Sequence, residues 1–583
     1  MKKDLLRTWA LWGRGLMLAL LSVSLVAPFT EYAYAQVRFA RTYGGSADEF
    51  PYSVQRTSDG GYIVAAYTNS FGAGDYDIFL IKTNSSGNVQ WAKTYGGTTR
   101  DRVYSVQQTS DGGYIVGGWR APASSTVDDV FLIKTDANGN IQWAKTFGGT
   151  DDDQDNSVKQ TSDGGYIMTG GTASFGAGNW DIWLIKTDAN GNISWAKTYG
   201  GTNYDYAYSV QQTSDGGYIL AGETRSFGAG NVDIILIKTN SSGNLQWAKT
   251  YGGTGSDITW SVQQTSDGGY IVAGYTNSFG AGNVDIILIK TNSSGNLQWA
   301  KTYGGTNYDY AYSVQQTSDG GYIVAGYTTS FGAGLSDVFL IKTDANGNVQ
   351  WAKTYGGTNY DWAYSVQQTS EGGYIVAGTT RSFGVGSYNI FFIKTDANGN
   401  IIWAKTYGGT GGDEAYSVQQ TSDGGYILAG RTYSFGAGTW DAFLIKTDAD
   451  GNIGSCSIVR NVTPTVTTPS PTVTTPSPSV SSISPTVNSV SPTVTSPTPT
   501  VHEPCPLSIS ESCQIASGII TPYKGGIKVR GSGEFEVKVY NVSGVMVKSI
   551  KGKDEVKLEL SRGVYFVEVI SGGKVIREKV VIR

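Results

Sequence analysis

The chain has 583 residues, of which 79 are glycine, 12% are aromatic and only 16% are charged. This composition excludes a disordered chain and predicts many short strands joined by tight turns. The formal charge of −5 excludes a basic nucleic-acid-binding surface. The single histidine, His502, excludes histidine-based triads and histidine-ligated metal sites over nearly the whole chain.

The first 35 residues have the pattern of an export signal. Basic residues precede an apolar run at residues 16–26, and Ala33-Tyr34-Ala35 forms a small-x-small cleavage pattern before Gln36. The run is too short for a membrane-spanning helix, which needs about 20 apolar residues. We therefore expect residues 1–35 to be removed and the mature protein to be exported without a transmembrane segment.

Residues 36–456 are built from a repeat of 52 residues. The tryptophan of a Trp-Ala-Lys-Thr phrase recurs with this period, and Phe39 holds the same position one period earlier. A Gly-Gly-Tyr phrase recurs with the same period and marks eight units. The recurring tryptophans are Trp91, Trp143, Trp195, Trp247, Trp299, Trp351 and Trp403.

Each unit is predicted to form four antiparallel strands. In one unit we expect these strands at residues 313–317, 322–327, 337–342 and 349–354, because Gly-Gly and Asn-Gly turns separate apolar runs there. Four antiparallel strands in about 40–50 residues are typical of a β-propeller blade, and a linear β-solenoid is the alternative.

The two ends of the repeat region favour the propeller. The chain begins with a lone fourth strand at residues 36–42, whereas the last unit has Ser455 in place of the tryptophan and lacks its own fourth strand. The first strand can therefore complete the last blade, a connection that makes sense only in a ring. We predict an all-β fold with an eight-bladed β-propeller and split-blade closure at residues 36–456.

The spacing Gly-x-x-x-Trp after the third strand, as from Gly139 to Trp143, resembles the tryptophan-docking repeat of eight-bladed quinoprotein-like β-propellers. The tryptophans are accordingly expected to pack between neighbouring blades. The cofactor chemistry of those enzymes is not expected here, because the repeat region has no vicinal cysteine pair.

A linker at residues 457–506 follows the repeats. It holds 11 of the 15 prolines, which predicts an extended, polyproline-like stalk, either a plain spacer or a platform for O-glycosylation. The cysteines Cys456, Cys505 and Cys513 suit a disulfide in an exported protein, but their spacing leaves the pairing open.

Residues 507–583 alternate between apolar and polar side chains, which predicts a small β-sandwich. The phrases at residues 539–544, 563–567 and 579–581 resemble the C-terminal sorting domain of the type IX secretion system. The resemblance implies that the secretion machinery carries the protein across an outer membrane, removes the tail and attaches the protein at the cell surface. A C-terminal adhesion or sugar-binding domain is the alternative.

An acid recurs in every unit, four residues after the Gly-Gly that ends the fourth strand. These carboxylates either accept hydrogen bonds from their own loops or bind cations. We favour the first role and expect no cofactor, with calcium as the alternative. The acids are Glu49, Asp101, Asp153, Asp205, Asp257, Asp309, Asp361 and Asp413.

Aromatic residues flank this acid in three units, at positions where other units have Arg, Gln, Ser, Ile or Glu. Because the scaffold tolerates all of these, we expect the aromatic side chains to be exposed and to suit sugar rings together with the acids. The candidate ligand-binding residues are Tyr204, Tyr206, Tyr308, Tyr310, Tyr360, Trp362, Asp205, Asp309 and Asp361. A more regular set is assigned to structural packing: Tyr52, Tyr104, Tyr208, Tyr312, Tyr364 and Tyr416.

These features predict a non-catalytic, secreted or cell-surface propeller that binds an extracellular glycan, polymer or surface protein through its loops. The alternatives are a secreted glycoside hydrolase or lyase that uses two carboxylates, and a purely structural surface protein. No catalytic residue is predicted, because the acids recur symmetrically. Two departures from the repeat pattern stand apart, the acidic run at residues 151–155 and the irregular loop at residues 122–126.

Overall fold

A computed structural model describes residues 38–121 and 127–453, six short segments between residues 458 and 502, and residues 520–582 apart from short gaps. The expected signal peptide, the loop at residues 122–126 and the three cysteines lie outside the described residues. Within the described part of the chain, no helix is long and apolar enough to cross a membrane.

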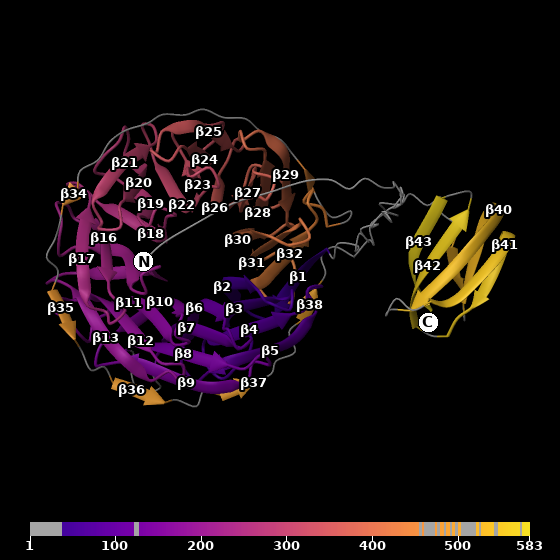
Figure 1. The fold of residues 1–583 in the computed structure, drawn as a ribbon, viewed down its shortest axis with the longest axis horizontal. Coiled ribbons are helices and arrows are strands. Elements are labelled where there is room, and N and C mark those ends of the chain that lie inside the picture. Colours follow the sequence, from indigo (N-terminus) through magenta and orange to yellow (C-terminus); the bar gives the residue numbers. More distant parts are fainter. Residues whose placement is uncertain are drawn as a thin grey trace, which may run out of the picture. The chain divides into compact units, whose positions relative to one another are not determined.

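Residues 39–447 form strands in groups of four, as the sequence predicts. Within each group the strands pair antiparallel, and the groups succeed one another around a common centre (Figure 1). The first strand of a group lies innermost and the fourth outermost (Figure 1). This all-β arrangement of repeated four-stranded sheets is consistent with a β-propeller, and we call it the repeat array.

The inner and second strands of each group form a hairpin. Its turn has a glycine in the left-handed conformation, such as Gly320 with a φ of 81°. The inner strands are β2 (Glu49–Arg56), β6 (Asp101–Gln108), β10 (Asp153–Gln160), β14 (Asp205–Gln212), β18 (Asp257–Gln264), β22 (Asp309–Gln316), β26 (Asp361–Gln368) and β30 (Asp413–Gln420). The second strands are β3 (Tyr62–Thr68), β7 (Tyr114–Arg120), β11 (Tyr166–Thr172), β15 (Tyr218–Thr224), β19 (Tyr270–Thr276), β23 (Tyr322–Thr328), β27 (Tyr374–Thr380) and β31 (Tyr426–Thr432).

The third strands carry the core. Residues 338–341 are apolar and fully buried, because neighbouring groups cover both faces of the sheet. The third strands are β4 (Asp77–Thr83), β8 (Asp129–Thr135), β12 (Asp181–Thr187), β16 (Asp233–Thr239), β20 (Asp285–Thr291), β24 (Asp337–Thr343), β28 (Asn389–Thr395) and β32 (Asp441–Thr447). The outer strands are β1 (Phe39–Gly44), β5 (Val89–Gly96), β9 (Ile141–Gly148), β13 (Ile193–Gly200), β17 (Leu245–Tyr251), β21 (Leu297–Tyr303), β25 (Val349–Tyr355) and β29 (Ile401–Tyr407).

Each outer strand docks onto a turn of the next group, and we call this contact the outer seam. The Trp91 ring lies against Gly139, where a Cβ atom would come within 2.8 Å of the ring. Tyr95 Oη donates to the Gly139 carbonyl oxygen at 2.7 Å, and Lys93 Nζ donates to Asn140 Oδ1 at 2.6 Å. Gly139 also has a φ of 72°, so this turn needs glycine for both its conformation and its space. The tryptophans therefore pack between groups.

Strand β1 comes first in the chain but is the outer strand of the last group. It pairs antiparallel with β32, with Phe39 opposite Lys446 and Tyr43 opposite Ala442. Phe39 takes the tryptophan's place against Gly87, and Tyr43 Oη donates to the Gly87 carbonyl oxygen at 2.7 Å. This is the pairing that split-blade closure requires.

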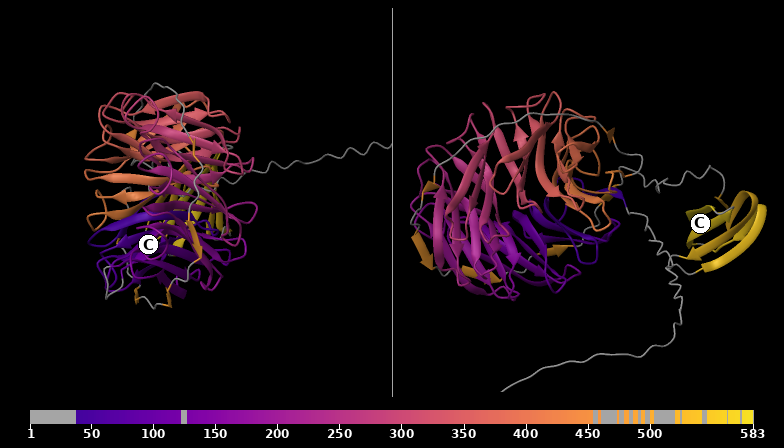
Figure 2. Two further views of the ribbon diagram at one scale, coloured as in Figure 1. Left: turned by 90° about the vertical axis from the view of Figure 1, so that its left-hand side faces the viewer. Right: turned by 45° about the horizontal axis from the view of Figure 1, so that its top comes forward.

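The described part of the linker differs from the predicted stalk, because it forms short strands that pair with outer strands of the repeat array. These strands are drawn in orange beside the outer strands in Figures 1 and 2. They are β33 (Ile458–Val459), β34 (Val473–Thr474), β35 (Ser479–Ser482), β36 (Thr486–Ser489), β37 (Thr493–Thr495) and β38 (Thr500–His502).

The C-terminal region forms a separate five-stranded antiparallel sheet. Its apolar core includes Val529, Val537, Leu558 and Val567, in agreement with the alternation in the sequence. The strands are β39 (Ile520–Tyr523), β40 (Gly526–Asn541), β41 (Met546–Glu559), β42 (Gly563–Ser571) and β43 (Lys574–Ile582).

Candidate functional site

Two sets of loops share one face of the repeat array. One set joins each outer strand to the next inner strand, and the other joins the second and third strands. In the first group, Ala47 N donates to Ser70 Oγ at 2.8 Å, and Asn69 N donates to the Asp48 carbonyl oxygen at 3.1 Å. Residues that vary between the units therefore lie together where these loops meet the inner strands.

The three acids of the predicted site are buried beneath the loops of this face. Asp205, Asp309 and Asp361 have no exposed area. The Oδ2 atom of Asp361 accepts hydrogen bonds from Gly357 N at 2.8 Å and from Ser382 Oγ at 2.6 Å. These acids therefore have the loop-organising role that the sequence favours, and they do not line the exposed surface.

In most groups a second buried acid, at the start of the third strand, lies beside the buried acid that begins the inner strand of the next group. A Cβ atom on Gly200 would come within 2.1 Å of Asp181 Oδ1 and 2.8 Å of Asp205 Oδ2, so both carboxyl groups crowd one glycine. Burial, and then the negative charge of Asp205, raise the pKa of Asp181 to about 6. In the group of β28, Asn389 replaces this second acid. No group of three or more acid, histidine or cysteine side chains that could hold a metal occurs among the described residues.

The first aromatic cluster of the predicted site surrounds β14. The rings of Tyr204 and Tyr206 stack with centroids 5.7 Å apart and planes 8° apart, and Trp180 packs 5.8 Å from Tyr206. Arg225 lies 5.5 Å over Tyr204. Tyr206 is only 6% exposed, because it fills the space above Gly171 of the preceding group. The expectation that this side chain is exposed is therefore wrong.

The second cluster spans β22 and β26. Tyr308 is 46% exposed, whereas the ring of Tyr310 packs 5.0 Å from that of Tyr327. Tyr327 in turn lies 5.7 Å from Trp362, and Tyr360 lies 5.8 Å from Trp362. The six predicted aromatic residues thus belong to two clusters, in which Tyr308 has the most exposed ring and the others are wholly or partly covered.

A row of side chains lies at the bulge of each inner strand, and the sequence analysis assigned the tyrosines of this row to structural packing. The bulge falls between residues three and five of the strand, as at Tyr312 between Ala311 and Ser313. Neighbouring rings touch from group to group, at 4.9 Å for Tyr208 and Trp260 and 5.5 Å for Tyr312 and Tyr364. We call this row the inner aromatic band: Tyr52, Tyr104, Tyr208, Trp260, Tyr312, Tyr364 and Tyr416, with Asn156 at the eighth position.

Several members of the band are the most exposed large apolar side chains of the inner strands: Tyr52 at 50%, Trp260 at 40% and Tyr312 at 36%. The regular recurrence of tyrosine at the bulge position suggested that these side chains pack in the core. The exceptions Asn156 and Trp260 indicate instead that the bulge position tolerates other residue types. A residue that packs in a core would not be replaced by asparagine without loss of stability.

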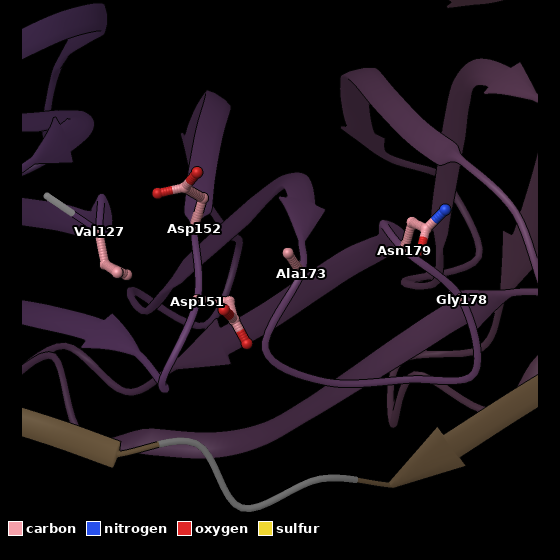
Figure 3. Close-up of a pocket in the computed structure, with 6 residues that line it drawn as sticks. All are labelled: Val127, Asp151, Asp152, Ala173, Gly178 and Asn179. Carbon is pink, nitrogen blue, oxygen red and sulfur yellow. The ribbon is translucent and has the colours of Figure 1, made fainter.

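The acidic run lines a separate hollow of about 390 Å³ on the loop face. Figure 3 shows Asp151 and Asp152 on the loop before β10, between Val127 and the loop before β12 that carries Ala173, Gly178 and Asn179. Asp152 Oδ1 accepts a hydrogen bond from Asp128 N at 2.8 Å. Asp155, in contrast, is buried in the core, and burial raises its pKa to about 7.

Two family models match parts of the chain. Residues 521–583 match the secretion system C-terminal sorting domain, and residues 265–297 match a β-propeller domain of unknown function, DUF5122. The protein is therefore secreted, through the type IX system, to the cell surface or the extracellular space.

One curated relative is the regulatory protein FlaEY of Caulobacter vibrioides, 23% identical over an alignment of 403 residues that covers 64% of this chain. The match spans 39% of the length of that relative.

Similar solved structures include Sqt1 from Chaetomium thermophilum, with 10% identity over 70% of this chain and 98% of that one and a TM-score of 0.42. A glycoside hydrolase family 32 structure from Bifidobacterium adolescentis has 10% identity over 76% of this chain and 82% of that one, with a TM-score of 0.24. Neither likeness is close enough to assign an activity.

Proposed function

We propose that this protein is a secreted, non-catalytic binding protein: an eight-bladed β-propeller, closed by β1, that holds an extracellular carbohydrate polymer at its inner aromatic band. The observation that carries the proposal is the exposure of aromatic side chains at the bulge of several inner strands. The cell-surface location set by the C-terminal domain suits a partner outside the cell.

Eight blades and ring closure are supported by the strand pairing. Eight four-stranded groups have the same strand order, and the last is completed by β1. The inner strand β2 of the first group also lies against β31 of the last group. A ring brings the eight positions of the band around one axis, so a polymer that reaches one aromatic side chain meets its neighbours as well.

A carbohydrate is the partner that this chemistry favours. Sugar rings present C–H faces that stack on aromatic rings and hydroxyl groups that bond to phenol oxygens. Cationic side chains lie beside the aromatic rings as well. Arg102 lies 5.2 Å over Tyr67 and 5.1 Å over Trp119, and Arg431 pairs with Glu414 at 2.8 Å. Polar groups of this kind give a largely aromatic surface its specificity.

We propose a non-catalytic role because Asp205, Asp309 and Asp361 are buried and accept hydrogen bonds from their own loops. A glycoside hydrolase or lyase is the second candidate, and the observation in its favour is the hollow lined by Asp151 and Asp152. Two accessible carboxylates at one hollow are the minimum that glycoside hydrolysis requires.

The proposal is tested by screening the full chain on a glycan array and measuring affinity for the best polymer by calorimetry. The double variant Tyr52→Asn, Tyr312→Asn should weaken binding about tenfold or more, because two stacking contacts of about 0.5–1.5 kcal/mol each are lost. Asn156 already occupies the equivalent position of another unit, so the fold should be unaffected.

Ile402→Gln on β29 is the matched control, since it changes an exposed side chain of the outer edge to the residue found in most other units. Equal loss of affinity in both variants, or no binding to any polymer, would rule out the proposed band. Release of short sugars by the wild type but not by Asp151→Asn or Asp152→Asn would establish the enzyme instead.

A further inference from the structure

The described linker strands follow the outer strands in a regular order. After β33, which pairs with β29, the five further linker strands pair along the chain with β17, β13, β9, β5 and β1, which is the reverse of the order of the groups. All five pairs have one register, with a valine of the linker opposite the aromatic residue at the end of the outer strand. The Cα partners are Val473 and Tyr251, Val480 and Tyr199, Val487 and Phe147, Val494 and Tyr95, and Val501 and Tyr43.

The sequence of the linker has an independent period that matches this order. A Pro-Ser/Thr-Val phrase recurs every seven residues, and the valines of the last five phrases are the residues that meet the outer strands. A step of seven residues in the linker thus corresponds to a step of 52 residues in the repeats. The phrases begin at Pro464, Pro471, Pro478, Pro485, Pro492 and Pro499.

The residue types suit this pairing. Seven extended residues span at most about 25 Å, enough for one short strand and a step to the next sheet. Valine and threonine favour strands, whereas proline is tolerated at the first position of an edge strand because it has no N–H group to leave unpaired. The outer strands would otherwise present free N–H and C=O groups, which invite pairing with other chains.

We propose that residues 472–502 form a belt around the repeat array, in which one seven-residue unit adds a fifth strand to each of five successive outer strands. The last unit, β38, pairs with β1, placing Thr500 opposite Gly44 and His502 opposite Thr42. Strand β1 is then held on both edges, by β32 and by the belt. The linker is thus part of the array rather than a stalk, and this role does not depend on the ligand of the inner band.

Hydrogen–deuterium exchange of the full chain tests the pairing. Val487→Pro removes an N–H group from the middle of β36 and should speed exchange of the β9 amides that face it about tenfold or more, with β5 and β13 unchanged. Val490→Pro is the matched control, because Pro476 and Pro497 occupy this position in other units, and it should leave β9 unchanged. Equal exchange of β9 in the wild type and both variants would overturn the belt.

Disulfide trapping tests the register and the identity of the belt. In a chain with Ser at the three native cysteine positions, the pair Lys145→Cys and Ser489→Cys should form a disulfide within one molecule, because these residues are Cα partners. The pair Lys145→Cys and Ser496→Cys, shifted by one unit, should not. Equal trapping of both pairs would contradict a fixed register, and disulfide-linked dimers from the first pair would show that the belt belongs to a second copy.

Discussion

The outer seam and the inner aromatic band lie on the same sheets but differ in how much the sequence can vary. At the seam every group uses the same contacts, an aromatic ring on a turn glycine and a basic side chain on an asparagine. At the second residue of the inner strands, eight positions hold seven different residue types: Phe50, Arg102, Gln154, Tyr206, Ile258, Tyr310, Trp362 and Glu414. The seam therefore determines the assembly of the groups, whereas residues of the inner edge can change to suit a partner.

The largest effect is expected from removing the first half of a seam strand. Deletion of residues 36–41 should leave part of the β32 edge unpaired and expose the turn at Gly87, because Phe39 no longer covers it. We expect loss of soluble, folded protein, measured by size-exclusion chromatography and circular dichroism. If the truncated chain melts like the wild type, β1 does not close the array.

A single seam residue should have the next largest effect. Trp403 is only 8% exposed and packs 6.1 Å from Tyr426 of the next group. Trp403→Ala should therefore lower the free energy of unfolding by about 3–5 kcal/mol, measured by denaturant titration. Trp299 is more exposed, so Trp299→Ala should cost about 2 kcal/mol. Equal costs would mean that burial does not set the strength of the seam.

Two tyrosines near the inner edge differ in burial. Tyr206→Ser should cost about 3 kcal/mol, because the ring fills the space above Gly171, although other units have Gln or Ile there. Tyr308→Ser should change stability by less than about 0.5 kcal/mol, since the ring is largely exposed. Thermal melts of the two variants check this order, and a larger loss in Tyr308→Ser would contradict it.

The smallest effect concerns pH. Burial, and then the charge of Asp361, raise the pKa of Asp337 to about 6, above the value of 3.8 for an unperturbed group. The folded state therefore binds more protons than the unfolded state between these values, and stability should fall as pH rises through 6. Asp337→Asn, which copies Asn389, should reduce this fall by about 2 °C in Tm between pH 4 and 8. An unchanged pH profile would show that Asp337 is ionised throughout.

The strands of each group were largely predictable, because turn glycines and apolar runs determine the bounds of three of the four strands. The predicted strand at 322–327 is β23 (Tyr322–Thr328), and that at 337–342 is β24 (Asp337–Thr343). The inner strand was expected at 313–317 but begins at Asp309, since the bulge at Tyr312 interrupts the alternation. A bulge displaces one residue from the pattern, and the segment before it then resembles a loop.

The candidate site was less predictable, because burial there depends on the neighbouring group. Nothing within the unit of Tyr206 indicates that Gly171 leaves room for its ring. The buried acids could be assigned to their loops from the sequence, since Gly-Gly and Ser lie at fixed distances from each acid. The period of the linker is present in the sequence, but its meaning needs the spacing of the outer strands, which only the assembled array provides.

The pairing of β1 with β32 has a consequence for the order of folding. Phe39 is synthesised first and Lys446 more than 400 residues later, yet they are Cα partners. Every other sheet of the array can form from neighbouring residues as soon as its own segment is available, whereas this one must wait for the whole region. Contacts between such distant residues form slowly, because the intervening chain must first be ordered. We therefore expect the last sheet to be the slow step of folding, and until it forms a nascent chain has an unpaired edge at β32 that a neighbouring chain can occupy.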